Sequence, residues 1–397
     1  MRMRRVLFGV ITIAFIGLLF GISASISYNF LNSSSFFVEH DFAEEREKKP
    51  KVYEFNIFMV GDALIHESVY FDAKTSNGYD FKPMIEKIKP ISSNYDLAYY
   101  NQETILGGTA LGLSHYPRFN SPQEVGDAMI DAGFDLVSLA TNHTMDRGEA
   151  GVLASVNYWE NKKDIITSGQ WSSWEDRNAV RTYEKNGIRY AFFSYTTLTN
   201  GLNTPYGKEY LNNVYSDEKA KNDIDKVKDN VDVIMVAMHW GVEYSLGVSE
   251  EQLRIANYLS SLGVDLIIGA HPHVVEPVEY INGGKTFVIY SLGNFISGQI
   301  GVEKLTGLMM EVTIRKVVDP DGNTTISVVE PKADLMYTRY YLNSSNRDFK
   351  VFPYSQLNDN ILPNYKNYYE KYKAVVSSRY PELQWGITGA WLYGNCK

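Results

Sequence analysis

Six short polar clusters follow apolar runs along this chain, and their side chains include the kinds that bind metal ions. The clusters are Gly61-Asp62, Asn101-Gln102-Glu103, Asn142-His143, His239-Trp240-Gly241, His271-Pro272-His273 and Gly293-Asn294. The apolar runs before them have the length and composition of buried strands. Because the carboxyl ends of strands in an α/β sheet line one crevice, these residues are expected to meet there.

The placement of the histidines makes this clustering informative. Of the 7 histidines in the chain, four stand at these strand ends: His143, His239, His271 and His273. Taken singly, each residue has a structural explanation, since Asn142 suits a helix N-cap, Asp62 suits a turn and Glu103 suits the surface. The segment His271-Pro272-His273 is hardest to explain in this way, because the proline stiffens a short loop that presents two imidazoles.

Imidazole, carboxylate and carboxamide groups without a thiolate suit Mn, Fe or Zn, and do not suit a structural zinc cage. Two such ions can share a bridging carboxylate and lower the pKa of a bound water toward neutrality. The residue types therefore predict a divalent-metal site, with two ions, of the kind that hydrolases use.

Helical patterns between the apolar runs must position these clusters. Residues 121–124 (SPQE) and 249–252 (SEEQ) have the pattern of helix starts with a capping box, and Gly133 and Gly263 follow as helix ends. Both helices lead into similar phrases, DAGFDLVSL and SLGVDLIIG, which indicate either an internal repeat or two ordinary helix-to-strand turns. Asn282-Gly283-Gly284 between VEYI and KTFVIY predicts a hairpin. The pattern indicates an α/β fold with a mainly parallel or mixed sheet.

Composition divides the chain into four segments. Residues 1–27 begin MRMRR and continue as an apolar run, which predicts a transmembrane anchor or a long signal peptide, with the rest of the chain extracytoplasmic at the cell membrane. Residues 28–51 are charged and predict a stalk, residues 52–333 form the α/β domain, and residues 334–397 form a tyrosine-rich extension. Cys396 is the only cysteine, so no internal disulfide forms.

The clusters resemble, in type and order, the CapA-type poly-γ-glutamate capsule biosynthesis family, which is related to the calcineurin-like metallophosphoesterases. The matching segments are VGDALIH (60–66), YNQETIL (100–106), ATNHTMDRGEAGV (140–152), MHWGVEY (238–244), IGAHPHVVEPVEYING (268–283) and YSLGNFISGQ (290–299). The resemblance implies a four-layer α/β/β/α sandwich with two facing mixed sheets. Thr141, Leu106 and Ala270 depart from residues common in the family, but none of these departures removes an expected ligand.

The same resemblance assigns roles to individual residues. The expected metal ligands are Asp62, Glu103, Asn142, His239, His271 and His273, with Glu103 as the bridging carboxylate. The expected catalytic residues are His143, which stabilises or protonates a leaving oxygen, and Asp146, which otherwise serves as a supporting or capping residue. The expected substrate-binding residues are His66, Asn101, Trp240 and Asn294.

Two functions remain open from the sequence. One is a membrane-anchored metallohydrolase acting on an envelope polymer. The other is a non-catalytic scaffold that binds or guides poly-γ-glutamate beside synthetase and export subunits. Gly284-Lys285-Thr286 resembles the end of a P-loop, but Glu279 stands where that motif needs glycine, so the chain is not expected to be the ATP-dependent ligase. A net charge of -9 argues against nucleic acid, and it means that binding a polyanion requires a local basic patch.

Overall fold

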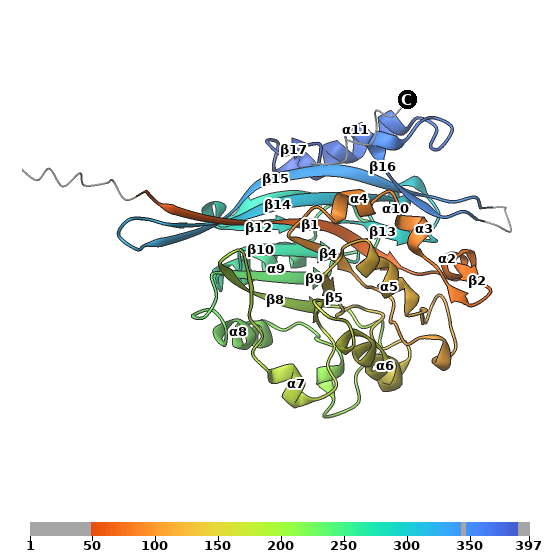
Figure 1. The fold of residues 1–397 in the computed structure, drawn as a ribbon, viewed down its shortest axis with the longest axis horizontal. Coiled ribbons are helices and arrows are strands. Elements are labelled where there is room, and N and C mark those ends of the chain that lie inside the picture. The colour runs from red at the N-terminus through yellow and green to blue at the C-terminus, as the bar shows by residue number, and fades with distance from the viewer. Residues whose placement is uncertain (1–48, 343–346, 388–397) are drawn as a thin grey trace, which may run out of the picture. The chain divides into compact units, whose positions relative to one another are not determined.

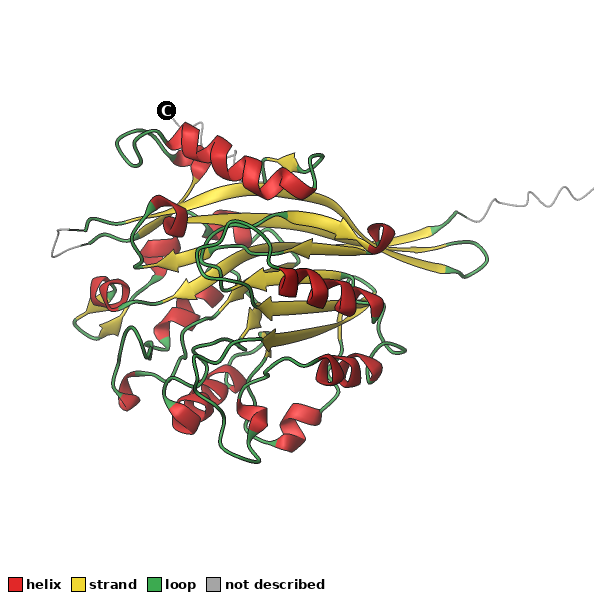
Figure 2. Ribbon diagram, turned by 180° about the vertical axis from the view of Figure 1, so that it is seen from behind, coloured by secondary structure: helices red, strands yellow, loops and turns green. Residues whose placement is uncertain are grey.

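The structure is a computed structural model that describes residues 49–342 and 347–387. Within these residues the chain forms two large mixed sheets with helices around them (Figures 1 and 2). The described ranges contain no helix that is both long enough and apolar enough to cross a membrane. The expected anchor (1–27) and nearly all of the expected stalk (28–51) lie outside the described residues.

The first sheet has nine strands within the described residues, in the order β16-β15-β14-β1-β4-β5-β6, with β13 beside β1 and β17 beside β15. Its strands are β1 (Lys51–Leu64), β4 (Leu97–Asn101), β5 (Leu136–Ser138), β6 (Ile166–Ser168), β13 (Asn294–Ser297), β14 (Thr306–Val318), β15 (Thr324–Arg339), β16 (Lys350–Pro353) and β17 (Gln384–Trp385). Strand β1 runs parallel to β4 and β13 and antiparallel to β14. The carboxyl ends of β1 and β4 therefore lie at one edge.

The second sheet has six described strands in the order β11-β12-β10-β9-β8-β7. These are β7 (Tyr183–Lys185), β8 (Ile188–Thr196), β9 (Val233–His239), β10 (Leu266–Ala270), β11 (Val278–Ile281) and β12 (Thr286–Ile289). Strands β8, β9, β10 and β12 are mutually parallel, whereas β11 and β12 form the predicted hairpin across Asn282-Gly283-Gly284. The expectation of two mixed sheets is confirmed. A further small pair, β2 (Lys74–Thr75) and β3 (Gly78–Tyr79), stands apart from both sheets.

Three apolar clusters give the order of the layers. One cluster joins the facing sides of the two sheets, including Met59 of β1 and Met235 of β9. The second lies between the outer side of the first sheet and α2–α6, and the third lies between the outer side of the second sheet and helices α8 and α9. The helices of these layers are α2 (Glu67–Asp72), α3 (Lys82–Ile85), α4 (Lys89–Ser92), α5 (Glu124–Asp131), α6 (Gly148–Glu160), α8 (Asp217–Asp225) and α9 (Glu250–Ser261). Helices thus cover both outer faces of the paired sheets.

One helix-to-strand connection occurs in both sheets. Gly133 and Gly263 end α5 and α9 at φ values of 92° and 94°. Asp135 then accepts a hydrogen bond from the backbone N–H of Ala98 at 2.8 Å, and Asp265 accepts one from Ile234 at 2.8 Å. Each aspartate ties the start of its strand to the neighbouring strand.

The two helix starts differ from each other. The capping box at Ser249 is confirmed, because its hydroxyl accepts from the Gln252 backbone while the Gln252 side chain accepts from the Ser249 backbone. The capping box predicted at Ser121 is wrong. Helix α5 begins at Glu124 without a side-chain cap, and the Ser121 hydroxyl bonds the Thr104 hydroxyl at 2.8 Å instead.

The expected domain boundary at residue 333 needs correction, because it falls inside β15. Residues beyond it continue the first sheet: Met336 pairs with Pro353 of β16, and Ala333 pairs with Trp385 of β17. Helix α11 (Tyr365–Val376) contributes Tyr372 and Val376 to the cluster between the sheets, and Figure 1 shows it lying along β15. The tyrosine-rich segment is therefore part of the domain as far as residue 387. The remaining short helices are α7 (Trp174–Asn178) and α10 (Val302–Leu305), with single 3-10 turns at 109–111, 209–211, 282–284, 354–356 and 377–379.

Candidate metal centre

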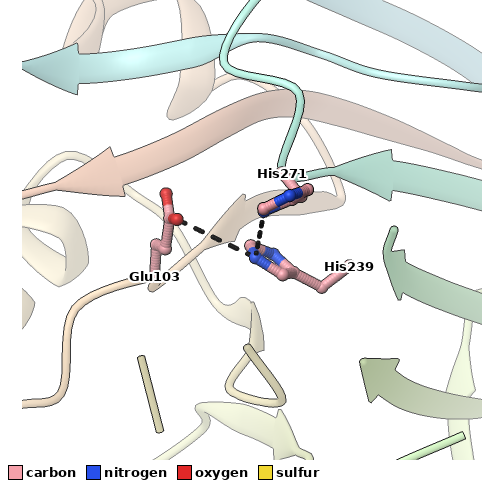
Figure 3. A group of neighbouring side chains, drawn as sticks. All are labelled: Glu103, His239 and His271. Atoms are coloured by element: carbon pink, nitrogen blue, oxygen red, sulfur yellow. Dashed lines mark hydrogen bonds and ion pairs between the residues drawn. The ribbon is translucent and has the colours of Figure 1, made fainter. Parts of the chain in front are cut away.

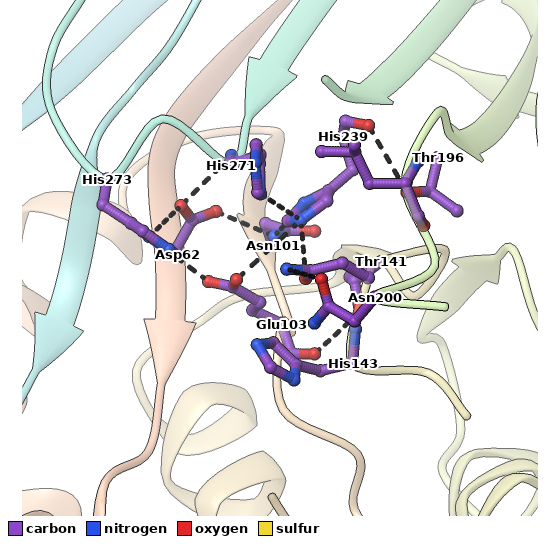
Figure 4. Close-up of polar contacts among 12 residues, drawn as sticks. Asp62, Asn101, Glu103, Thr141, His143, Thr196, Asn200, His239, His271 and His273 are labelled. Atoms are coloured by element: carbon purple, nitrogen blue, oxygen red, sulfur yellow. Dashed lines mark hydrogen bonds and ion pairs between the residues drawn. The ribbon is translucent and has the colours of Figure 1, made fainter. Parts of the chain in front are cut away.

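The strand-end clusters do meet in space, and the strand register explains why. Asp62 at the end of β1 is paired with Asn101 of β4 on one side and with Asn294 of β13 on the other. In the second sheet, Ala270 is paired with His239, so that His271 follows directly beside it. Because both sheets present these ends at one edge, the side chains gather in one buried cluster (Figure 4).

Three buried residues define what we call subsite 1: Asp62, Glu103 and His273. The His273 Nδ1 atom lies 3.4 Å from Asp62 Oδ2 and 3.7 Å from Glu103 Oε2. The candidate ligand atoms of all three lie within 4.8 Å of one another. Two carboxylates and one imidazole at this spacing are a plausible ligand set for one divalent ion.

Subsite 2 consists of Glu103, His239 and His271 (Figure 3). The His239 Nε2 atom lies 3.8 Å from Glu103 Oε1 and 3.2 Å from His271 Nδ1. Asn142 Oδ1 adds a further oxygen 3.0 Å from His239 Nε2. Glu103 thus belongs to both subsites, one carboxylate oxygen facing each.

The surroundings of Glu103 indicate that a positive charge belongs at this place. Glu103 is 1% exposed, and neither of its carboxylate oxygens has a hydrogen-bond partner in the described part of the chain. A buried carboxylate left in this way costs on the order of several kcal/mol unless a cation compensates it. The Thr141 hydroxyl donates to the Glu103 backbone carbonyl at 2.8 Å, which holds the residue while its side chain stays available.

The electrostatics differ among the titratable groups of the cluster. Burial raises the pKa of the Glu103 carboxyl well above its usual value. Burial alone would lower the pKa of His273, but the nearby Glu103 and Asp62 carboxylates raise it to about 9. Burial, with neighbouring imidazoles, lowers the pKa of His271 to about 3 and that of His239 well below its usual value. Two of these imidazoles are thus held neutral, the form in which histidine binds a metal.

The loop after β10 has an unusual backbone that aims two imidazoles at the cluster. His271 has a φ of 99° and His273 a φ of 60°, in the region that favours glycine. Backbone strain of this kind persists only where the surrounding contacts impose it. Here the His271 backbone N–H donates to Asp62 Oδ2 at 3.3 Å, and the Tyr244 N–H donates to the Pro272 carbonyl at 2.8 Å.

His143 lies beside the cluster and in neither subsite. Its Nδ1 atom is 2.7 Å from Asp146 Oδ2, an oxygen that also accepts from the Phe119 backbone N–H at 2.6 Å. The Phe119 ring packs edge-on against the His143 imidazole, with 4.7 Å between ring centroids. In Figure 4 the His143 ring lies next to Glu103, apart from the other three imidazoles. Asp146 therefore fixes the orientation of the His143 ring through the Nδ1 atom.

Two of the expected substrate-binding residues form hydrogen bonds with candidate metal ligands. Asn101 donates to Asp62 Oδ1 at 2.8 Å, and its own oxygen accepts from the Ser138 hydroxyl at 2.5 Å. Asn294 Oδ1 lies 3.1 Å from His273 Nδ1, and its amide donates to the Lys304 carbonyl at 2.8 Å. Both asparagines are 1% exposed and bond Asp62 and His273, and their expected contact with substrate stays a prediction.

The other two substrate-binding candidates, Trp240 and His66, lie in different surroundings. Trp240 is fully buried in the apolar cluster behind the second sheet, and its indole N–H donates to the Tyr290 carbonyl at 2.9 Å. It faces away from the metal cluster, so a substrate contact at Trp240 is not supported. His66 lies at the rim, partly exposed, with its ring edge-on to Phe119 at 5.2 Å. Burial lowers its pKa to about 4, and it remains a candidate.

Comparison with known proteins assigns the chain to a family. The model of the bacterial capsule synthesis protein PGA_cap matches residues 56–299. The chain belongs to the PGA_cap family. All six expected ligands lie within the matched residues, whereas β14–β17 and α11 lie beyond them.

Two curated PGA_cap relatives come from Bacillus. The PGA biosynthesis protein CapA of Bacillus subtilis (strain 168) is 33% identical over 172 residues, covering 43% of this chain and 44% of the relative. The capsule biosynthesis protein CapA of Bacillus anthracis is 28% identical over 218 residues, covering 53% and 51%. The chain thus spans about half the length of the curated relatives it matches.

Solved structures similar to this PGA_cap chain include two enzymes of phosphate chemistry. A calcineurin-like phosphoesterase, YfkN from Bacillus subtilis, has 16% sequence identity and a TM-score of 0.41, covering 72% of this chain and 91% of that chain. A phosphatase from Mycoplasma pneumoniae has 16% identity and a TM-score of 0.43, covering 72% and 94%.

The PGA_cap domain also brings two unexpected residues to the cluster. The exposed Glu243 has a carboxylate oxygen within 4.8 Å of ligand atoms of His271 and His273, and Tyr244 has its ring 5.9 Å from that of His273. Gly241, at a φ of 90°, lets the chain turn back over the 271–273 loop. The glycine after His239-Trp240 was the available sequence signal for this reversal. Asn200 is a further addition, accepting a hydrogen bond from the Asn142 amide at 3.4 Å.

Proposed function

We propose that this chain is a membrane-anchored, extracytoplasmic protein of poly-γ-glutamate capsule biosynthesis whose buried cluster holds two divalent ions and supports hydrolysis. The observation that carries the proposal is Glu103, which is buried between the two subsites with neither carboxylate oxygen hydrogen-bonded in the described residues. Membership of the PGA_cap family and the names of the Bacillus relatives support the link to the capsule polymer.

The ligand set fits Mn, Fe or Zn. Asp62, Glu103 and His273 would hold one ion, and Glu103, His239, His271 and Asn142 would hold the other. When bound, such a pair of ions lowers the pKa of a coordinated water and supplies a nucleophile at neutral pH. Asn101 and Asn294 support this site by fixing the directions of Asp62 and His273.

His143 is the residue we assign to proton transfer. Asp146 occupies its Nδ1 atom, which leaves Nε2 to meet the oxygen of a leaving group. The Phe119 ring beside His143 limits the access of water from one side.

The chemistry is cleavage, and it differs from that of an ATP-dependent ligase. The P-loop-like residues Gly284-Lys285-Thr286 stand at the β11–β12 hairpin, whereas a P-loop joins a strand to a helix. We therefore place the chain beside synthetase and export subunits, where cutting a phosphoester or an amide would set polymer length or release.

The decisive experiment measures metal and turnover together on the full-length chain. We expect close to two equivalents of Mn, Fe or Zn by elemental analysis, and hydrolysis of an aryl phosphate or shortening of poly-γ-glutamate. Asp62→Asn should lower both the metal content and the turnover. Metal-free protein, or turnover that survives Asp62→Asn, would refute the proposal.

A non-catalytic scaffold is the second candidate, and the names of the two relatives favour it because they describe biosynthesis. The scaffold needs the polymer-binding surface and can dispense with turnover. In a deletion strain it predicts that Asp62→Asn and His143→Ala restore surface polymer as well as the wild type does. The hydrolase predicts polymer of altered length or amount.

A further inference from the structure

A cleft of about 500 Å³ lies beside Asp146, the residue that holds His143. The segment around Arg118, the loop carrying Asp146, the first turn of α6 and the 202–205 loop all contribute to its walls. Asp146 lines the cleft and its Oδ2 atom holds His143 Nδ1, so the cleft lies on the Nδ1 side of the proposed proton donor.

The charges around the cleft do not cancel. Glu149 pairs with Lys208, whose Nζ lies 2.6 Å and 2.7 Å from the two carboxylate oxygens. Asp146 binds His143 and the Phe119 backbone N–H through one oxygen, Oδ2. Arg118 and Arg147 are exposed, and in the described ranges neither forms an ion pair. Arg147 donates to the Leu111 carbonyl, which steadies its guanidinium and leaves other N–H groups available.

The two arginines come from separate parts of the chain. Arg118 precedes the buried Phe119, and Arg147 follows Asp146 directly, so the contact between Phe119 and Asp146 brings the two segments together. Guanidinium groups bind carboxylates through paired, charge-assisted hydrogen bonds, and they retain their charge at any physiological pH. In a chain of net charge -9, such a local surplus of positive charge is what a polyanion needs.

We propose that this cleft is a subsite for the free carboxylates of an anionic polymer, with Arg118 and Arg147 as the binding residues. The identification of the polymer as poly-γ-glutamate rests on the function proposed above. Each γ-linked residue carries one free carboxylate, so a chain in the cleft is held by its side groups. The subsite adds affinity and direction, and the metal cluster remains the place of reaction.

The test is binding of fluorescently labelled poly-γ-glutamate to the full-length chain, followed by fluorescence anisotropy. Arg118→Gln and Arg147→Gln should each weaken binding several-fold, and the double variant should weaken it about tenfold or more. Polymer with methyl-esterified carboxylates should bind the wild type as weakly as free polymer binds the double variant. Arg118 makes the safer single variant, because the side-chain bond to Leu111 belongs to Arg147.

Arg189→Gln is the matched control, because it removes the same charge from an exposed position at the start of β8, at the end of that strand opposite to the metal cluster. It should change the affinity less than twofold. The carboxylate subsite is refuted if Arg189→Gln weakens binding as much as the cleft variants do, or if the double variant binds like the wild type. It is also refuted if esterified polymer binds the wild type equally well, or if the wild type does not bind the polymer.

The same proteins separate this subsite from the proposed hydrolase. Metal content should be equal in the wild type and in the double variant, since neither arginine belongs to a ligand group. Binding that depends on the arginines in a chain without metal would refute the hydrolase and support the cleft. Metal-dependent shortening of the polymer that is unaffected in the double variant would support the hydrolase and refute the cleft.

Discussion

The unit β4-α5-β5 of the first sheet and the unit β9-α9-β10 of the second are alike until the last strand ends. In both, a glycine with positive φ ends the helix, and an aspartate then accepts a backbone N–H from the neighbouring strand. The segment after β5 contains Asn142, His143 and Asp146, whereas the segment after β10 contains His271 and His273.

The loops after these strands differ in backbone as well as in chemistry. The 271–273 loop holds two histidines at positive φ and directs both imidazoles at ligand positions. The loop after β5 directs one amide oxygen toward His239 and turns His143 to Asp146. A shared scaffold therefore brings two strand ends to one place, and the loop after each strand sets whether its histidine faces the candidate ligands or Asp146.

The largest expected effect separates the histidines of the two loops. His273→Ala should remove at least half of the bound metal, because subsite 1 then keeps only carboxylates. His143→Ala should keep the metal and lower turnover about 100-fold or more, as loss of an acid catalyst does. Elemental analysis and hydrolysis rates check both. Equal metal loss in the two variants would contradict the distinction between the loops.

The next effect concerns the shared glycines. Gly133→Ala and Gly263→Ala should each destabilise the fold by about 1–2 kcal/mol, because alanine avoids positive φ. Gly133→Ala should cost about 1 kcal/mol more, since its new Cβ would lie 3.0 Å from Ser93 Cα, whereas nothing lies within 4 Å at Gly263. Urea unfolding of both variants measures the difference. Equal losses of stability would show that the backbone at Ser93 moves to make room for the new Cβ.

A smaller effect distinguishes the helix starts. Ser249→Ala should lower the free energy of unfolding by about 1 kcal/mol. It should also speed hydrogen exchange at the Gln252 amide, whose N–H donates a hydrogen bond to the Ser249 hydroxyl. Ser249→Thr keeps the hydroxyl and serves as the control. Ser121→Ala should leave amide exchange in the first turn of α5 unchanged, because Ser121 caps nothing there.

The last effect is a pH dependence of the two aspartates. Burial raises the pKa of Asp135 to about 6 and that of Asp265 to about 7, despite the backbone N–H each accepts. A folded pKa above the unfolded value of about 3.9 means that stability is highest in acid and falls as pH rises from about 4 to the folded pKa.

Replacing each aspartate by asparagine should therefore remove a decline that ends near pH 6 for Asp135 and near pH 7 for Asp265. Between pH 5 and pH 8 the decline should be about 1 kcal/mol for Asp135 and about 2–3 kcal/mol for Asp265, because each pKa unit is worth about 1.4 kcal/mol. Urea unfolding across that range measures it. A variant that steepens the decline would contradict the sign.

Much of the metal centre was predictable because strand ends and residue types are local properties. The apolar runs placed Asp62, Glu103, Asn142, His239, His271 and His273 at strand ends, and the structure brings them together. The hairpin at 282–284 and the capping box at Ser249 were predictable for the same reason, since each depends on three or four adjacent residues.

Other features could not be read in this way. A polar residue after a strand can face the crevice, a neighbouring ligand or the core, and the sequence does not say which. In the structure the Asn101 side chain bonds Asp62, the Asn294 side chain bonds His273, and Trp240 packs into the core. Glu243 was missed because it reaches the cluster only through the chain reversal at Gly241. The strands β16 and β17 were missed because both are short, and each gains its partner, β15, only in the folded sheet.

The sequence by itself determined the chemical types at the site and the local elements that carry them, because hydrophobic periodicity and capping depend on near neighbours. Only the tertiary structure decided which side chains face one another. The contact of the His271 backbone with Asp62 spans 209 residues, and that of His239 with Asn142 spans 97. Such contacts form when two sheets pack face to face. A contact between two loops, from the Phe119 backbone to Asp146, likewise brings Arg118 and Arg147 to one cleft.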